Sequence, residues 1–291
     1  MTNWILGVIG GSGLYDIDGL ENCREESVDT PWGSPSGLLT RGRLGSVELV
    51  FLPRHGAGHV LTPSTVNYRA NIAALKQLGC TDVLSISAVG SLQDAYAPGD
   101  FVMIDQFIDR TIAREKSFFG PGCVAHVSMA DPICERLSIM AGDAAEAAGA
   151  KVHRGGTYLA MEGPQFSTRA ESHMYRAWGC DVIGMTNMPE AKLAREAELP
   201  YATVAMVTDY DCWRETEAAV SVEAVLEVLG RNSATAKSLI KCLADALSRI
   251  DRTPTRQGIE RALDFAVITA PEAREPELVE KLTSVAGRVL G

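Results

Sequence analysis

Short apolar runs alternate with amphipathic stretches along most of the chain, which is the pattern of strands that alternate with helices. The runs predicted as strands cover residues 4–9, 47–52, 83–87, 101–105, 157–161, 181–185 and 201–207. Helical spacing of apolar residues, with Pro near a first turn or Gly after a last turn, predicts helices over residues 62–79, 133–149, 168–179, 189–198 and 220–250. Strands that are apolar throughout are typical of a parallel sheet covered on both faces. We therefore expect an α/β fold with a mixed, mostly parallel central sheet flanked by helices.

The chain has 291 residues, which is enough for one large core, with two domains as the alternative. No repeat, linker or low-complexity tract divides it. We expect a single domain over residues 1–250 and a C-terminal helical tail, 251–291, packed on the same domain.

Charge and cysteine usage narrow the class of protein. A formal net charge of −10 disfavours a nucleic-acid or anionic-membrane surface, so any bound phosphate has to be held by a local cluster. Seven scattered cysteines without a Cys-x-x-Cys pair indicate reduced thiols in the cytoplasm rather than disulfides or a metal site. No stretch is long enough to span a membrane, and the apolar run at 4–11 is too short and glycine-rich for a signal peptide.

Polar residues that directly follow predicted strands are the candidates for chemistry. Gly10-Gly11-Ser12-Gly13 follows the first strand and suits an anion nest, although a simple tight turn explains it equally well. Arg54, His55 and His59 follow the strand at 47–52. Such groups occur on ordinary surfaces, but directly after a buried strand they favour a binding site, and Arg offers a fork of donors suited to phosphate.

Two carboxylates, Asp209 and Asp211, arrive where the strand at 201–207 should end. Alternation with period two sends both to one side of the chain, and ligands of α/β sheets bind beyond the carboxyl ends of the strands. Two acids so placed suit a ring nitrogen and an exocyclic amine of one base. The alternative is that they cap the following helix or lie solvated in a loop.

Two further segments allow both a structural and a functional interpretation. Ser167 or Thr168 with Glu171 predicts a capping box, and Phe166 before it is either a hydrophobic staple or a lid over a flat ligand. Val222, Val225 and Leu226 share one helix face, for which core packing is the first interpretation.

These segments, taken in order, resemble the trimeric purine nucleoside phosphorylases, and most closely the members that cleave 5′-methylthioadenosine. The resemblance covers roughly residues 5–230 and rests on six ordered motifs: 10–13, Arg54-His55, 87–91, 162–166, Met185-Thr186 and 208–213. It implies cleavage of 5′-methylthioadenosine by phosphate to adenine and 5-methylthioribose 1-phosphate, a step of purine and methionine salvage.

The resemblance also implies roles for individual residues. The phosphate site would comprise Ser12, Arg54, His55, Ser87, Ala88 through its backbone, and Thr186. The nucleoside would be bound by Met185 and His59 at the ribose, by Phe166 and Ser167 at the purine, and by Val222, Val225 and Leu226 at the methylthio group, joined by His126 of a neighbouring subunit. Asp209 would face the imidazole nitrogen of the purine and Asp211 its 6-amino group.

The substrate preference depends on two of these positions. Family members that prefer 6-oxopurines carry Asn at position 209 and Glu at position 167, whereas this chain has Asp and Ser. An acid suits an adenine amine, so the adenine-type reaction is expected, with methylthioinosine, inosine or guanosine as the alternative substrates and a silent nucleoside-binding protein as a third hypothesis. A raised pKa would allow Asp209 to protonate the departing purine. The resemblance implies a homotrimer or hexamer, phosphate as co-substrate and no metal or organic cofactor.

Overall fold

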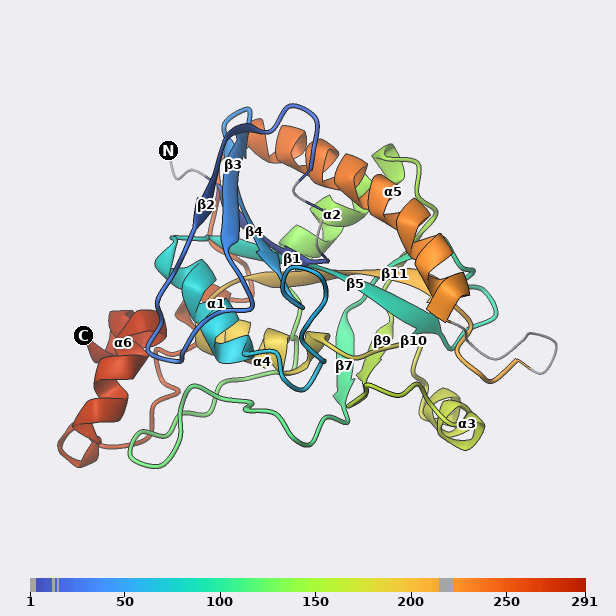
Figure 1. The fold of residues 1–291 in the computed structure, drawn as a ribbon. Coiled ribbons are helices and arrows are strands. Elements are labelled where there is room, and N and C mark those ends of the chain that lie inside the picture. The colour runs from blue at the N-terminus through green and yellow to red at the C-terminus, as the bar shows by residue number, and fades with distance from the viewer. Residues whose placement is uncertain (1–3, 12–13, 15, 215–221) are drawn as a thin grey trace.

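One mixed sheet of eleven strands forms the centre of the described part of the chain (Figure 1). The computed structural model describes residues 4–11, 14, 16–214 and 222–291, and of residues 222–224 it describes the backbone. The strands are β1 (Ile5–Gly10), β2 (Glu21–Glu26), β3 (Leu39–Leu44), β4 (Val47–Pro53), β5 (Asp82–Ser91), β6 (Phe101–Met103), β7 (Gln106–Asp109), β8 (Val152–Arg154), β9 (Thr157–Ala160), β10 (Val182–Gly184) and β11 (Tyr201–Asp209). The helices are α1 (Tyr68–Gln77), α2 (Glu135–Ala147), α3 (Arg169–Ala177), α4 (Asn187–Glu196), α5 (Val222–Ser248) and α6 (Pro276–Leu290), with short 3₁₀ turns η1 (Ile259–Arg261) and η2 (Pro271–Ala273).

The sheet is organised around β5, which exchanges partners along its length. On one side, its first half pairs with β1, as far as Ile9 opposite Ser85. On the other side it pairs with β11. Where β1 has ended, β10 pairs antiparallel with Gly90 and Ser91. Six of the ten pairings among the described strands are parallel, so the predicted mixed, mostly parallel sheet is confirmed.

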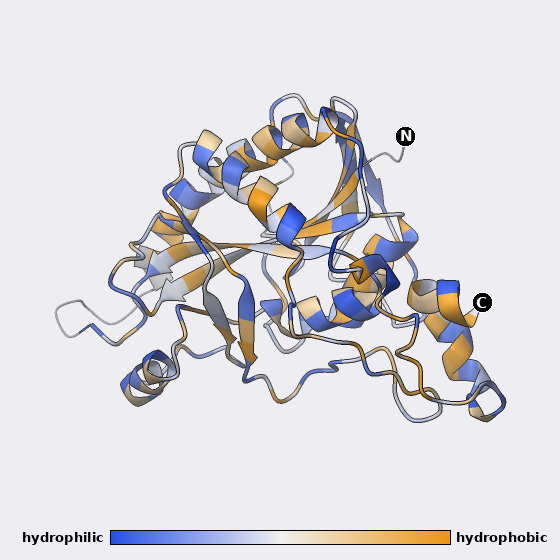
Figure 2. Cartoon of the chain, turned by 180° about the vertical axis from the view of Figure 1, so that it is seen from behind, coloured by the Kyte–Doolittle hydropathy of each residue, from blue (hydrophilic) through white to orange (hydrophobic). Residues whose placement is uncertain are grey.

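Helices cover both faces of the sheet, as a sheet of apolar strands requires. α2 and α5 pack together over one face, and α1 and α4 lie on the other (Figure 1). Most helices alternate hydrophilic and hydrophobic segments (Figure 2), as expected for helices with one apolar face. α4 is the exception, because all its residues except Lys192 are buried. In the centre, Val83 and Leu84 of β5 and Val204 of β11 are fully buried, and each such side chain contributes about 1.5–3 kcal/mol to stability.

The boundaries of two predicted elements are wrong. The helix predicted from residue 62 begins at Tyr68, because the side chain of Asn67 accepts a hydrogen bond from the Ala70 N–H and caps the first turn. Residues 88–91, which lie beyond the predicted end of the strand at 83–87, continue β5, because β10 pairs with them. β2, β3, β7 and β8 were not predicted; β2 is a polar edge strand and has no apolar pattern.

The C-terminal tail packs on the main core. Leu282, Val285 and Ala286 of α6 are buried in the same apolar cluster as β1 and β5. The indole N–H of Trp4 also donates to the Ile250 carbonyl at 3.0 Å, which ties the end of α5 to the first strand. The division of the chain at residue 250 stays a prediction.

The predicted capping box before α3 is confirmed for Thr168. Its hydroxyl accepts from the Glu171 N–H at 3.3 Å, and the Glu171 carboxylate accepts from the Thr168 N–H at 2.8 Å. We expect Thr168→Ala to lower the free energy of unfolding by about 1 kcal/mol, because the Glu171 N–H loses its acceptor and the Glu171 carboxylate loses the Thr168 hydroxyl. Urea denaturation measures this change. Thr168→Ser keeps the hydroxyl and should stay within about 0.5 kcal/mol of the wild type; an equal loss in both variants would contradict the capping role.

Candidate active site

The predicted phosphate residues gather where β1, β4 and β5 end together. The backbone N–H of Arg54 donates to the carbonyl of Gly10 at 2.9 Å, so the end of β4 lies beside the end of β1. The Arg54 guanidinium donates to the Ile86 carbonyl at 3.1 Å, one residue before Ser87. Ser12, predicted at the same edge, lies outside the described residues.

Arg54 is anchored by a buried carboxylate that was not predicted. Its Nε and Nη2 donate to the two oxygens of Glu190 at 2.8 and 3.0 Å, and both side chains are almost fully buried. Nη2 also donates to the Ser85 hydroxyl at 2.6 Å. Four of the five N–H groups of the guanidinium are therefore engaged within the protein, which leaves one on Nη1 for an anion.

The ion pair keeps Arg54 charged. Burial alone lowers the pKa of the guanidinium, but the Glu190 carboxylate more than offsets this and raises the pKa above its usual range. Glu190 belongs to α4, 136 positions away in the chain. An acid inside a helix gives no sequence signal that distinguishes it from a solvated residue.

His55 is present as a neutral imidazole at pH 7. Burial and the neighbouring Arg54 charge lower its pKa to about 4. Its Nδ1 contacts the Leu61 carbonyl oxygen at 2.8 Å, so Nδ1 carries the proton. No hydrogen bond among the described residues uses the backbone N–H of His55. His59 stacks on this ring at 4.2 Å between centroids and is itself exposed, with a φ of 57°.

β10 brings Thr186 back toward Ser87. It runs antiparallel along the last residues of β5, and Met185 and Thr186 follow its end. The buried Tyr158 hydroxyl lies 3.4 Å from the Ser87 hydroxyl and bonds to the backbone of Thr186. Ala88, next to Ser87, is exposed at this edge. Within the described residues the Thr186 hydroxyl forms no hydrogen bond, so it remains available to a ligand.

The two aspartates meet above Gly90, but not by strand alternation. β11 ends at Asp209, after a bulge between Val207 and Asp209, and Asp211 lies beyond it with a φ of 52°. The Asp211 N–H donates to Asp209 Oδ1 at 2.7 Å, and the Thr208 hydroxyl donates to Oδ2 at 2.7 Å. A turn closed by a side chain, and not the period of a strand, therefore places the two acids together.

Asp211 offers a buried acceptor. Its side chain is buried, and Oδ2 has no hydrogen-bond partner in the part of the chain that the structure describes. Burial raises the pKa of this carboxyl, although the nearby hydroxyls of Ser172 and Ser167 oppose this. A buried oxygen without a partner costs free energy until a donor reaches it, so this position suits a ligand that carries an N–H group.

The loop after β9 closes on these acids. The Cys212 thiol contacts the Ser167 carbonyl at 3.3 Å, which places Ser167 beside Asp211. Phe166, before Ser167, is 46% exposed. Arg114, which was not predicted, donates to the carbonyls of Glu162 and Met185 at 2.7 and 2.5 Å, so one buried cation joins the start of this loop to the end of β10.

The structure describes the side chains of the predicted methylthio residues only in part. Val225 is half-buried, Leu226 is 58% exposed, and the side chain of Val222 lies outside the described residues. His126 is exposed on the segment that pairs with residues 266–268, near α6 and far from the start of α5 (Figure 1). This chain does not bring its own His126 to its own site.

Neither a metal cluster nor a membrane helix is found in the described ranges. No group of three or more His, Cys, Asp or Glu residues there could hold a metal ion. No described helix is long and apolar enough to cross a membrane.

Comparison with known proteins identifies the family. The family model described as "Phosphorylase superfamily" matches residues 5–245. The chain belongs to the phosphorylase superfamily. Among its relatives in that superfamily, the S-methyl-5′-thioadenosine phosphorylase of Rhodospirillum rubrum is 60% identical over 99% of this chain and 97% of its own. That of Cereibacter sphaeroides is 59% identical over 98% of both chains.

Solved structures of the superfamily agree with the fold. A methylthioadenosine phosphorylase from an Antarctic soil metagenomic library superposes with a TM-score of 0.91 and 47% identity, covering 98% of this chain and 99% of its own. A variant of the adenosine/methylthioadenosine phosphorylase of Schistosoma mansoni, in complex with methylthioadenosine, gives a TM-score of 0.84 and 38% identity, covering 94% and 99%.

The two aspartates leave no room for a side chain at position 90. A Cβ there would lie 3.0 Å from Asp209 Oδ1 and 3.4 Å from the Cβ of Asp211. We expect Gly90→Ala to displace both acids and lower kcat/KM by about 10²-fold, as misplacement by about 1 Å does. Steady-state kinetics checks this. The control is Gly230→Ala on α5, where a Cβ meets nothing within 4 Å; equal activity in the two variants would contradict the packing argument.

Proposed function

We propose that the protein cleaves 5′-methylthioadenosine by phosphorolysis, releasing adenine and 5-methylthioribose 1-phosphate. The observation that carries this proposal is the pair Asp209 and Asp211 above Gly90, beside the cluster of Arg54, His55 and Thr186. An acid pair for a purine thus adjoins a cationic, donor-rich site for phosphate. The names of the relatives reported above support the same reaction.

Phosphate is held by one charge and a set of neutral donors. Arg54 supplies the charge and one N–H, since Glu190 and the neighbouring oxygens engage its other donors. Neutral His55 offers its backbone N–H, because its Nδ1 proton is used by Leu61. The hydroxyls of Ser87 and Thr186 complete the described set. Fixed donors of this kind position the nucleophile beneath the ribose and need no reorganisation during the reaction.

The departing purine is neutralised by the acid pair. Negative charge builds on its imidazole ring as the glycosidic bond breaks, and Asp209 supplies a proton to the ring nitrogen. Asp211 Oδ2, buried and without a partner among the described residues, accepts from the exocyclic amine. Asp209 has to carry a proton for this role, and a second carboxyl as its neighbour favours that form.

Ser167 and Asp209, which replace the Glu and Asn of 6-oxopurine enzymes, favour adenine as the base, and Asp211 favours it as well. The Asp211 acceptor matches a 6-amino group and opposes a 6-oxo oxygen, because two acceptors would face each other. Inorganic phosphate is the co-substrate, and the reaction uses no metal or organic cofactor. The dispersed free cysteines of the described chain fit a reducing cytoplasm, where the products would enter purine and methionine salvage.

Purine release from 5′-methylthioadenosine, adenosine, methylthioinosine and inosine, each with and without phosphate, tests the reaction. We expect adenine from methylthioadenosine only with phosphate present, and a fall in kcat of about 10²–10⁴-fold for Asp209→Ala, the usual size of an acid–base contribution. Asp245→Ala, on the exposed end of α5, is the matched control. Release without phosphate, or near-normal turnover of Asp209→Ala, would overturn the mechanism. Preference for inosine would overturn only the base assignment.

We further propose that the active form is a homotrimer, or a hexamer of trimers, in which His126 reaches the methylthio group of a neighbouring subunit. The His126 N–H donates to the Ala266 carbonyl at 2.9 Å, which fixes it beside Phe265 and Ile268. These two apolar side chains are 98% and 62% exposed. An exposed aromatic and aliphatic surface next to a site residue supports burial against another copy.

Sedimentation analysis of the wild type should give three or six times the chain mass of 31.2 kDa. Phe265→Asp should lower that mass and raise KM for methylthioadenosine, because a carboxylate in an apolar interface is costly. Ile139→Asp, at a 50% exposed position on α2, should change neither quantity. A monomeric, fully active wild type would exclude the shared site.

A further inference from the structure

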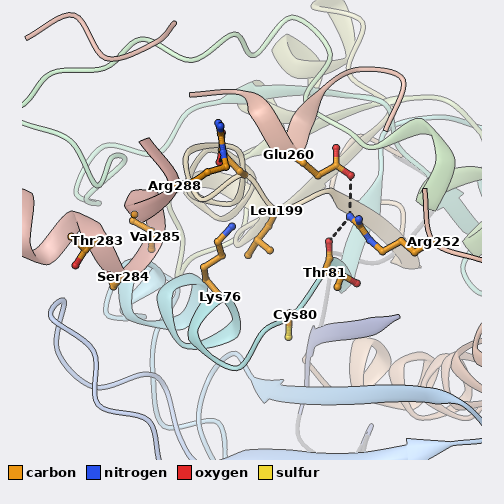
Figure 3. Close-up of a pocket in the computed structure, with 12 residues that line it drawn as sticks. Lys76, Cys80, Thr81, Leu199, Arg252, Glu260, Thr283, Ser284, Val285 and Arg288 are labelled. Atoms are coloured by element: carbon orange, nitrogen blue, oxygen red, sulfur yellow. Dashed lines mark hydrogen bonds and ion pairs between the residues drawn. The ribbon is translucent and has the colours of Figure 1, made fainter. Parts of the chain in front are cut away.

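A second cavity lies at the opposite edge of the sheet from the acid pair. Its volume is about 400 Å³, within the range of small-molecule pockets. Cys80 and Thr81, which precede β5, and Leu199, which precedes β11, form part of its wall. Arg252, η1 and α6 complete it (Figure 3). The amino ends of the central strands thus border this cavity, whereas their carboxyl ends carry the catalytic groups.

The two carboxylates in its wall are fully engaged. Glu198 accepts from Nε and Nη2 of Arg288 at 2.7 and 2.5 Å and from the Leu263 N–H at 3.0 Å. Glu260 accepts from Arg252 at 2.9 Å and from the hydroxyl of Thr255 at 2.6 Å. Glu198 and Glu260 therefore already have cationic partners within the protein, so the cavity does not need a cationic ligand.

The cation Lys76 stands in the opposite situation. It extends from the last turn of α1 into the cavity (Figure 3), and its ammonium group forms no hydrogen bond or ion pair among the described residues. Burial lowers the pKa of its ammonium group, although the nearby Glu198 charge opposes this. Nη1 of Arg288 likewise makes no hydrogen bond within the described structure. Donors are in excess here, and the wall between them is apolar at Leu199 and Val285.

We propose that this cavity binds a small organic anion, with its carboxylate or phosphate monoester head on Lys76 and a short apolar body against Leu199 and Val285. An anion supplies the acceptor that the Lys76 ammonium lacks and restores the interactions that burial removed. The two head groups share this chemistry, and the experiment below separates them. The binding is independent of the purine reaction, since Lys76 touches none of its residues.

Calorimetric titration of the full-length protein with hexanoate and with phenyl phosphate tests the site. We expect at least one probe to bind the wild type at least 10-fold more tightly than Lys76→Met, whereas uncharged hexanamide shows no dependence on Lys76. Any anion binding at the catalytic site is common to both proteins and cancels in the comparison. The control is Lys281→Met, an exposed lysine of α6 outside the cavity wall, which should bind as the wild type does.

Thermal unfolding supplies a second readout that does not depend on the stability of the variant itself. The probe that binds should raise the unfolding midpoint of the wild type and of Lys281→Met by more than it raises that of Lys76→Met and Lys76→Gln, because any binding at the catalytic site is common to all four proteins. Turnover of methylthioadenosine should be the same in all four proteins. Equal affinities of the wild type and Lys76→Met for both probes, no binding at millimolar concentration, or equal binding of hexanamide would each overturn the proposal.

Discussion

The buried ion pair between Arg54 and Glu190 is the interaction on which the catalytic edge depends. It joins the end of β4 to α4, and the Asn187 amide and Tyr201 hydroxyl extend it to β5 and β11 through bonds of 2.9 Å to Ser85 and 2.8 Å to Glu190. Loss of either charge would leave the other buried, at a cost of about 3–5 kcal/mol. The phosphate site is therefore built on a rigid polar core, and its cation is fixed before any ligand arrives.

The second constraint is the partner exchange along β5. Because the pairing of β1 with β5 ends at Ile9, the last residues of β5 are free to pair with β10, and the chain returns through Met185 and Thr186 to the phosphate side. The bulge in β11 directs Asp209 over Gly90 at the same place. Phosphate donors and purine acids thus become neighbours although they come from distant parts of the chain.

The two edges of the sheet have different chemical character. At the carboxyl edge, hydroxyls, a neutral imidazole and a paired carboxyl face the ligand, and Asp211 holds a buried acceptor without a partner among the described residues. At the amino edge the acids are engaged, and the Lys76 ammonium and Nη1 of Arg288 have donors without a partner among the described residues. Each edge is therefore complementary to a different kind of ligand, and occupancy of one does not require the other.

The sequence by itself determined the strand and helix alternation, and hence the sheet and the edge that carries the site, because fully buried strands need continuous apolar runs. It also indicated Arg54, His55 and Asp209, because charged or polar groups directly after such strands stand out. Only the tertiary structure decided the partners of these groups. Glu190 lies in a predicted helix, where nothing distinguishes it from a solvated acid, and Arg114 lies in a loop without a pattern. Asp211 is placed by a turn rather than by alternation. Hydrogen bonds between residues far apart in the chain leave no periodicity in the sequence, so they can be identified only in the folded structure.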